Sequence, residues 1–493
     1  MSIRKAIILN PDAQKVFKQH PRFFSFLRKR IIRRSFLGLP LSLISIGFFY
    51  VFFLFVKTLY NVLVLGRIVA IDQRIAQLFI YFRNPKAVAV FTWISLLGKW
   101  PIIVGLAILI SIIFLLWNKK SYLFYFWLAL GIDEFLNYLI KILIRRPRPI
   151  NSVYLKDSFS FPSGHAMIAV VFYGFLAYLL IRYFKKWKTR IGIFLIWLLL
   201  VLIIGFSRLY LGVHYLSDVL AGYLLGLLIL LAVITLHKWR EIKKDKFNNI
   251  SKSAIKRTEG EKKVIVIIIF IIGIAWYFIF GSFYHLEKAE PVGPVVKNVS
   301  SDILTYFFEQ NIPRYSETIT GEQQEPLGFI FLAKDDDSLI QDFEKSSWFL
   351  ADRFNFCSIF KVSKAVVKNR EYLRGPITPS FWNGTVHNFG FQRLINNDVR
   401  QRHHIRIWKT NLKQGDHLIY VGTASLDEGI KWLITHTINP DIDTERNFVK
   451  QSLELGGAII EEKETQFVKP VLGENFGGDP FFTNGKLFVI YLQ

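Results

Sequence analysis

Cysteine is almost absent from this chain, which has one, Cys357, among 493 residues. A single thiol excludes an intrachain disulfide framework and says little about the cellular compartment. Acidic residues are also scarce, with 37 against 62 lysines and arginines, and the formal net charge is +25. Apart from one basic linker there is no low-complexity tract, and we find no internal repeat.

Long uncharged runs fill the first half of the chain and cease near Tyr284. Together with the length of 493 residues, this split predicts a polytopic membrane protein joined to a soluble domain. Much of the basic excess lies in short segments that flank the apolar runs. The positive-inside rule explains that placement better than nucleic-acid binding does.

The apolar runs predict seven membrane spans, and the first is expected to be an uncleaved anchor because it follows a basic stretch and is long enough to span. The expected spans are 36–56, 101–117, 121–140, 165–181, 191–206, 218–236 and 264–284. Residues 57–100 are expected to form a short amphipathic helix on the far side, with re-entry of 87–96 as the alternative. Basic segments at 1–35, 118–120, 182–190 and 237–263 then share the cytoplasmic side.

Three polar clusters are predicted to lie at the far-side ends of spans: Lys141–Pro149, Phe161–His165 and Ser207–Asp218. A charge at bilayer depth costs on the order of 3 kcal/mol on insertion scales, so these groups are expected to serve a function. The planar guanidinium groups of the arginines and the ammonium of the lysine, which come from separate segments, can together bind the oxygens of a phosphoryl group. Ser163 and Gly164 at a helix start add a hydroxyl and backbone N–H groups.

Two histidines in these clusters can divide a displacement at phosphorus, one attacking and the other protonating the departing oxygen. If His214 and Asp218 lie on one helix, their spacing puts both side chains on the same face, where the carboxylate fixes the imidazole tautomer. Neither a metal nor another cofactor is expected, because no acidic cluster here suits Mg²⁺ and the basic residues can neutralise the developing charge.

The three clusters carry a pattern that resembles the type 2 phosphatidic acid phosphatases (PAP2), which share their site with vanadium haloperoxidases. That pattern is Lys-x6-Arg-Pro, then Pro-Ser-Gly-His, then Ser-Arg-x5-His-x3-Asp, and all three parts occur here in order between Lys141 and Asp218. The resemblance covers about residues 60–235. The resemblance implies that His214 is a nucleophile forming a phosphohistidine, Asp218 its partner and His165 the general acid. It also implies a metal-free phosphate site made of Lys141, Arg148, Ser163, Gly164 and Arg208, and a water that hydrolyses the intermediate.

Other basic and aromatic residues near these clusters have simpler interpretations. For Lys141, Arg148 and Arg208 of the motifs, the alternative is a role as interfacial anchors whose basic groups snorkel to the membrane surface. Arg145 and Arg146 lie outside the motif, and headgroup contact or plain positive surface explains them equally well. Tyr210, Tyr215 and Trp100 are interpreted as interfacial aromatics.

The expected architecture is an all-α polytopic bundle, a PAP2-like six-helix core plus one further helix, followed by a soluble α+β domain. Its expected parts are a basic cytoplasmic N-terminus (1–35), the phosphatase domain (36–236), a basic linker (237–263), the seventh span (264–284) and the soluble domain (285–493). In that domain we expect strands at 328–332, 417–421 and 487–491 and helices at 299–310 and 427–436.

The soluble domain resembles the LssY-type C-terminal domain over about residues 290–470, a resemblance that implies no settled function. Its polar cluster includes plausible metal ligands, namely His403, His404, Asp427, His436, Asp441 and Asp443. Adjacent histidines on a strand point to opposite faces. A hydrogen-bonded structural network is therefore favoured over a metal site.

The sequence thus predicts a lipid-phosphate phosphatase of a bacterial inner membrane, with its active site and C-terminal domain on the periplasmic side. Phosphatidic acid, phosphatidylglycerophosphate, undecaprenyl diphosphate and lipid A phosphates all fit as substrates. The expected partners are this lipid and the bilayer, with no nucleic acid and an unknown protein partner for the C-terminal domain. Alternatives are a lipid-to-lipid phosphotransferase, a vanadate-dependent oxidase, which an intramembrane setting disfavours, and a non-catalytic scaffold.

Overall fold

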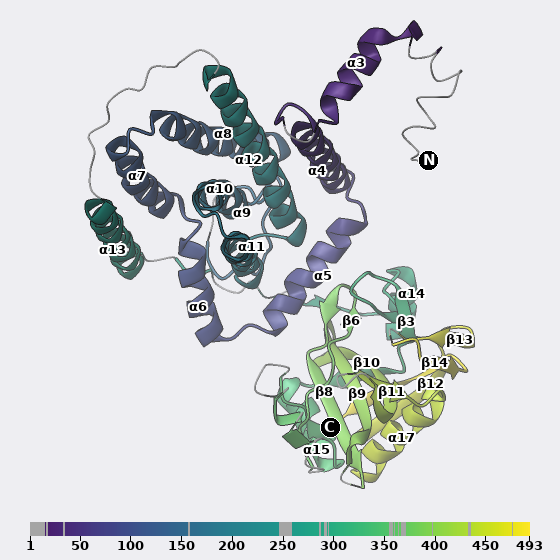
Figure 1. Cartoon of the computed structure of the whole chain (residues 1–493). Helices are drawn as coiled ribbons and strands as arrows, with labels where there is room; N and C mark the ends of the chain where they lie inside the picture. The colour runs from purple at the N-terminus through teal and green to yellow at the C-terminus, as the bar shows by residue number, and fades with distance from the viewer. Residues whose placement is uncertain are drawn as a thin grey trace. The chain divides into compact units, whose positions relative to one another are not determined.

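The computed structural model describes most of the chain, namely residues 15, 18–32, 35–155, 158–245, 259–284, 287–289, 293, 295–353, 358, 360–362, 364–365, 371–396, 398–431, 435–475 and 477–493. Much of the basic N-terminus, residues 246–258 of the linker, and Cys357 lie outside the described residues. The chain divides into two compact units (Figure 1). The first comprises residues 1–64, 86–148 and 154–288, and the second comprises 65–85, 149–153 and 289–493.

The first unit is helical. Its elements are α3 (Pro21–Arg30), α4 (Leu39–Leu63), α6 (Pro85–Leu96), α7 (Trp100–Leu116), α8 (Lys120–Ile144), α9 (Gly164–Ile168), η1 (Ala169–Tyr173), α10 (Gly174–Tyr183), α11 (Trp187–Tyr210), α12 (Leu216–Asp245) and α13 (Glu259–Phe283). Among the described residues, α4, the continuous α9–α10 segment, α11, α12 and α13 are long and apolar enough to cross a membrane. A sixth span results if α6 and α7, which meet at a 42° bend, are counted together.

These helices agree with five of the seven expected spans, and with a sixth, 101–117, if the bent α6–α7 pair counts as one span; the multi-pass membrane character of the chain follows from their length and apolarity. The remaining expected span, 121–140, lies on α8, which carries Asp133 and Glu134 and is not among the candidate spans. The count of seven therefore stays a prediction. The bend between α6 and α7 leaves both a broken span and a re-entrant segment open.

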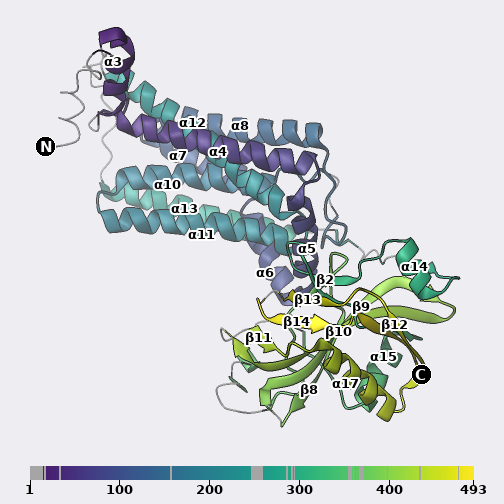
Figure 2. The same ribbon diagram turned by 90° about the vertical axis from the view of Figure 1, so that its right-hand side faces the viewer.

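The centre of the helical unit is the segment from α9 to α10, which packs against α8, α11 and α12 (Figures 1 and 2). Its residues 166–172 are all buried. Two glycines of α12 permit this close packing: a Cβ on Gly222 would lie 2.6 Å from the Ser163 carbonyl oxygen, and one on Gly226 would lie 2.8 Å from that of Met167. Backbone contact at these points fixes where α9 begins.

The second unit contains four described helices and three sheets. The helices are α5 (Arg67–Tyr81), α14 (Ile303–Glu309), α15 (Asp336–Lys345) and α17 (Ile442–Leu455). The main sheet has the strand order β12-β15-β4-β10-β9-β8-β5, with β1 paired to β9 and β11 to β10. Its strands are β1 (Lys297–Asn298), β4 (Phe329–Ala333), β5 (Phe349–Leu350), β8 (Phe389–Ile395), β9 (Asp398–Gln414), β10 (His417–Lys431), β11 (Thr435–Ile438), β12 (Ile459–Gln466) and β15 (Lys486–Leu492).

Two smaller sheets complete this unit. One pairs β13 (Val471–Glu474) with β14 (Pro480–Thr483), and the other has the order β3-β2-β6-β7. The strands of the latter are β2 (Tyr315–Glu317), β3 (Gln323–Pro326), β6 (Phe381–Trp382) and β7 (Thr385–Val386). The main sheet separates two apolar clusters, since Phe329 and Phe331 of β4 face one and Ile330 and Leu332 face the other. Strand β4 is thus buried on both faces.

The α+β composition and the three expected strands are confirmed, as β4, part of β10 and β15. The expected helix at 299–310 is present as α14. The expected helix at 427–436 is wrong, because β10 runs on to Lys431 and β11 begins at Thr435. The β9–β10 ladder ends at the pair of Asp427 with Arg402, and from Asp427 to Lys431 β10 pairs with β11, so backbone hydrogen bonds to a neighbouring strand replace those of a helix.

Candidate active site

The first motif lies where α8 ends. Arg145 adopts a left-handed conformation (φ 50°), and its N–H donates to the Lys141 carbonyl, which closes the helix just before Pro147 and Pro149. Lys141 is in the last turn, and its Nζ donates to the Phe159 carbonyl over 2.6 Å. The end of α8 therefore directs the lysine toward the loop that precedes α9.

Arg148 joins this loop to the third motif. Its Nε donates to the Ser158 carbonyl over 2.6 Å, and Nη2 donates to the Ser158 hydroxyl over 2.9 Å. Nη1 donates to the Val213 carbonyl and lies 3.3 Å from His214 Nε2. One guanidinium thus bridges two segments that are far apart in the sequence.

The second motif begins α9. The Ser163 N–H donates to the Asp218 carbonyl over 3.0 Å, and the Ser163 Oγ is buried without a hydrogen-bond partner among the described residues. A Cβ on Gly164 would lie 3.0 Å from the Asn137 amide, so glycine permits α8 to approach here. His165 follows in the first turn of α9 and lies against Gly98.

The third motif surrounds His214, which lies in the turn between α11 and α12. Its Nδ1 is 3.5 Å from Asp218 Oδ2, which also accepts from the Tyr215 N–H over 2.9 Å. His214 precedes the first residue of α12, so the condition that both groups share one helix is not met, although the contact is made. When the ring proton is on Nδ1, facing the carboxylate, the lone pair of Nε2 points toward Arg148.

Arg208 is in the last turn of α11 and is buried. Its Nη1 donates to the Ser95 hydroxyl of α6, and its Nε has no hydrogen-bond partner among the described residues. The contact with Ser95 was not predicted from the sequence, because Ser95 lies outside the three motifs. A cation kept out of water with an unsatisfied donor is expensive unless an anion completes its coordination.

Electrostatics show how far the three motifs converge. Burial, followed by the charges of Arg148, Lys141, Arg208 and His165, holds the pKa of His214 well below its usual value. Four residues from separate segments therefore act on one imidazole that is only 3% exposed. Such an imidazole stays neutral and nucleophilic where an ordinary histidine is protonated.

Arg146 is a site residue that the motif did not include. Its Nη1 donates to Asp218 Oδ1 over 2.6 Å and to the Ser217 hydroxyl over 2.7 Å, and its guanidinium lies over the Tyr215 ring at 4.3 Å. The two sequence interpretations, headgroup contact and plain positive surface, are both wrong for this buried side chain. Neighbouring Arg145 is exposed, so only the fold separates the two arginines.

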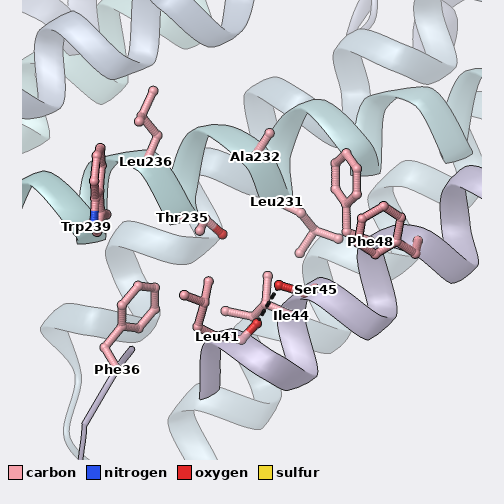
Figure 3. A pocket seen from close by; sticks show the side chains of 11 residues that line it. Phe36, Leu41, Ile44, Ser45, Phe48, Leu231, Ala232, Thr235, Leu236 and Trp239 are labelled. Atoms are coloured by element: carbon pink, nitrogen blue, oxygen red, sulfur yellow. Dashed lines mark hydrogen bonds between the residues drawn. The ribbon is translucent and has the colours of Figure 1, made fainter. Parts of the chain in front are cut away.

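An apolar cavity of about 430 Å³ also lies in the helical unit, between α4 and α12 (Figure 3). Leu41, Ile44 and Phe48 of α4 face Leu231 and Thr235 of α12 across it. Its polar atoms include the Ser45 hydroxyl, which is already bonded to the Leu41 carbonyl over 2.9 Å. None of the motif residues lines this cavity, so it is not part of the candidate site.

Two family models match the chain: the PAP2 superfamily over residues 122–242 and the LssY C-terminus over residues 309–487. Phosphatidylglycerophosphatase B of Bacillus subtilis (strain 168) is 34% identical over 164 residues, which cover 33% of this chain and 81% of that protein. Undecaprenyl-diphosphatase of Sulfolobus acidocaldarius is 37% identical over 93 residues, 17% of this chain and 41% of that protein.

Two solved structures are also similar. One is a transmembrane PAP2-type phosphatidylglycerolphosphate phosphatase from Bacillus subtilis, 28% identical, covering 41% of this chain and 98% of that chain with a TM-score of 0.35. The other is LpxE of Aquifex aeolicus, 28% identical, covering 33% and 92% with a TM-score of 0.25. The PAP2 match over residues 122–242 includes all three motifs described above.

Proposed function

Because this chain belongs to the PAP2 superfamily, we propose that its buried histidine cluster removes phosphate from a lipid headgroup through a phosphohistidine. The chain is a multi-pass membrane protein and a phosphoric ester hydrolase of the lipid phosphatase type. The observation that carries the proposed mechanism is the setting of His214, with the Asp218 carboxylate at one ring nitrogen and Arg148 at the other.

In the first step, His214 Nε2 attacks phosphorus, the N–P bond forms and the bond from phosphorus to the lipid oxygen breaks. Protonated His165 gives its proton to the departing oxygen, so the lipid leaves as an alcohol, or as a monophosphate if the headgroup is a diphosphate. Asp218 keeps the proton of His214 on Nδ1 and stabilises the cation that forms.

In the second step, water replaces the histidine on phosphorus. Neutral His165 takes one proton from the water, the oxygen bonds to phosphorus and the N–P bond breaks. Inorganic phosphate leaves, His214 returns to its neutral form and His165 is protonated again. The same side chain thus acts as acid and then as base.

The basic residues supply the electrostatic part of this proposal. Lys141, Arg148 and Arg208 neutralise the charge on the phosphoryl oxygens, and the buried hydroxyl of Ser163 and the N–H groups at Gly164 donate to them. Arg146 acts as a positioning residue, because it contacts the Asp218 oxygen that does not face His214.

We place the site and the C-terminal domain on the extracytoplasmic side of a bacterial inner membrane, with seven spans in which α8 and the bent α6–α7 pair each cross once. The distribution of lysine and arginine in the loops supports this orientation. A reporter fused after Gln493 tests it, and a cytoplasmic signal would contradict the seven-span topology.

The substrate is proposed to be a phosphomonoester or diphosphate headgroup, with phosphatidylglycerophosphate as the first candidate because of the relative that bears this name. The test is phosphate release by purified protein in detergent from phosphatidylglycerophosphate, phosphatidic acid, undecaprenyl diphosphate and lipid A phosphates. We expect turnover of at least one, and a loss of more than about 1,000-fold in His214→Ala.

A second histidine of the bundle offers a matched control. His237 is buried against the Tyr122 and Tyr125 rings of α8 and is not part of the motif. His237→Phe keeps a ring at that position and should keep turnover within about threefold. Undiminished turnover in folded His214→Ala, or equal losses in both variants, would contradict the proposed mechanism. Phosphate transferred to an added lipid acceptor instead of water would identify a phosphotransferase.

A further inference from the structure

The second unit contains a cavity of about 340 Å³ whose lining mixes charged, neutral polar and apolar residues. Its charged groups come from Arg402 and Arg406 of β9, Asp427 of β10, Glu325 of β3 and Glu317 of β2. Apolar side chains, including Phe82 and Phe381, form another part of the lining. The volume and the mixture of apolar surface with a few polar groups are typical of a site for a small molecule.

The polar lining follows from strand periodicity. Arg402, His404 and Arg406 alternate along β9 with Ile405 and Ile407, which belong to the apolar core on the other face. In register with the three polar residues stand Asp427, Ser425 and Thr423 of β10. A polar patch is thus built into the middle of the main sheet, where a structural role alone would favour apolar side chains.

Most charges in this region are paired. Arg402 Nε donates to Asp427 over 2.8 Å, and its Nη1 donates to the Gln392 side chain over 2.6 Å. Arg74 forms an ion pair with Glu317. Burial lowers the pKa of His404 to about 4, against the effect of Asp427, so this ring is neutral near pH 7.

The two remaining groups are Arg406 and Glu325, which shift each other's pKa through their opposite charges but do not form an ion pair. Arg406 donates from Nε to the Thr378 carbonyl over 3.2 Å, and its two terminal nitrogens have no hydrogen-bond partner among the described residues. The carboxylate of Glu325, which is 7% exposed, accepts from the Ser425 hydroxyl over 3.4 Å and from no other group in the described part of the chain. Beside Arg406, the buried Thr423 hydroxyl also lacks a partner in this part of the structure.

We propose that this cavity binds a small anion that also carries a hydroxyl or amino donor. A phosphate or carboxylate group fits the terminal nitrogens of Arg406, which form a planar fork. The donor of the same ligand reaches Glu325, whose buried carboxylate otherwise has one weak hydrogen bond. A ligand of this class completes the coordination of both groups, which a simple anion does not.

The test is equilibrium dialysis of radiolabelled glycerol 3-phosphate or glycerate against the purified full-length protein in detergent. The protein carries His214→Ala and Arg148→Ala, so that the helical site neither turns over the probe nor retains its full phosphate coordination. We expect one saturable site for at least one probe. Arg406→Gln should weaken binding at least about tenfold, and Arg406→Lys should also weaken it, because an ammonium lacks the fork.

Lys413 is the matched control, since it is an exposed cation on the same strand and does not line the cavity. Lys413→Gln should leave binding unchanged within about twofold. No saturable binding of either probe, or equal binding by folded Arg406 variants, would overturn the proposal. Inorganic phosphate that binds as tightly as glycerol 3-phosphate would overturn it as well, because the donor would then contribute nothing. The readout is binding, so it is independent of the phosphatase activity.

Discussion

Each unit of this protein contains a buried arginine bonded to a carboxylate, and the two pairs differ in what the carboxylate touches next. In the helical unit, Arg146 binds Asp218, whose other oxygen faces the His214 imidazole. In the second unit, Arg446 binds Asp443 over 2.9 Å and the Lys486 carbonyl over 2.6 Å.

The carboxylate of Asp443 accepts next from the Thr483 hydroxyl and the Asn484 N–H, so the pair ties α17 to the turn between β14 and β15. Both arginines are buried and paired, although the Asp443 side chain is 17% exposed and that of Asp218 is fully buried. The third group is where the two pairs differ most. A carboxylate that contacts a titratable ring beside a cluster of cations indicates a catalytic role, whereas a carboxylate that contacts a turn indicates a structural role. The predictions below test this distinction.

The largest effect is expected from Arg446→Leu, which leaves Asp443 without its cation. Removing one partner of a buried ion pair typically costs about 3–5 kcal/mol, so unfolding of the second unit should shift to markedly lower denaturant. Arg374→Leu, which breaks an exposed pair with Glu344, should cost about 0–1 kcal/mol. Chemical unfolding of the full-length variants measures both, and equal costs would contradict the structural role of Arg446.

Arg146→Met should act on turnover. We expect kcat to fall about 100-fold, roughly 2.7 kcal/mol, because Asp218 loses the group that orients it toward His214. The acid limb of the pH profile should move as well, which loss of packing alone would not cause. Exposed Arg145→Met is the control and should stay within about twofold; similar losses in both variants would refute a positioning role.

The pH dependence should reflect the lowered pKa of His214. The neutral imidazole is the nucleophile, so kcat/KM falls where His214 becomes protonated, and a lowered pKa places this acid limb below the ordinary value of about 6.5. Arg148→Ala removes one of the charges that lower the pKa, so the limb should move to higher pH. A limb at or above 6.5 in the unaltered protein, or a shift to lower pH in the variant, would count against this assignment.

The smallest effect is expected from EDTA. Because lysine and arginine side chains are proposed to neutralise the phosphoryl charge, turnover should be unchanged within experimental error when divalent cations are chelated. The measurement is phosphate release with and without EDTA. Loss of turnover that Mg²⁺ restores would show that a metal ion shares this task.

The sequence predicted the helical and α+β parts, five spans (six if the bent α6–α7 pair is one), three strands and the eight motif residues that the structure brings near one another. It did so because apolar length and fixed motif spacing are local properties. It also predicted that His403 and His404 face opposite ways, and His403 pairs with Glu445 whereas His404 lies 3.4 Å from Asp427.

Two features could not be predicted because they depend on distant pairing. Arg146 is distinguished from Arg145 only by the turn after α8, which directs one side chain inward to Asp218. The segment after Asp427 is a strand because it pairs with β11, although its composition suggests a helix. The proposed cavity of the second unit likewise depends on β3, β9 and β10 coming together.

The most direct test of the central claim is to trap the intermediate. Protein mixed with a ³²P-labelled lipid phosphate is quenched within milliseconds, and the label on protein is measured for the unaltered chain, His165→Asn and His214→Ala. We predict an acid-labile, alkali-stable phosphohistidine that forms in the unaltered chain, forms and decays more slowly in His165→Asn, and is absent from His214→Ala. Labelling of folded His214→Ala at the same level would contradict the assignment of His214 as the nucleophile.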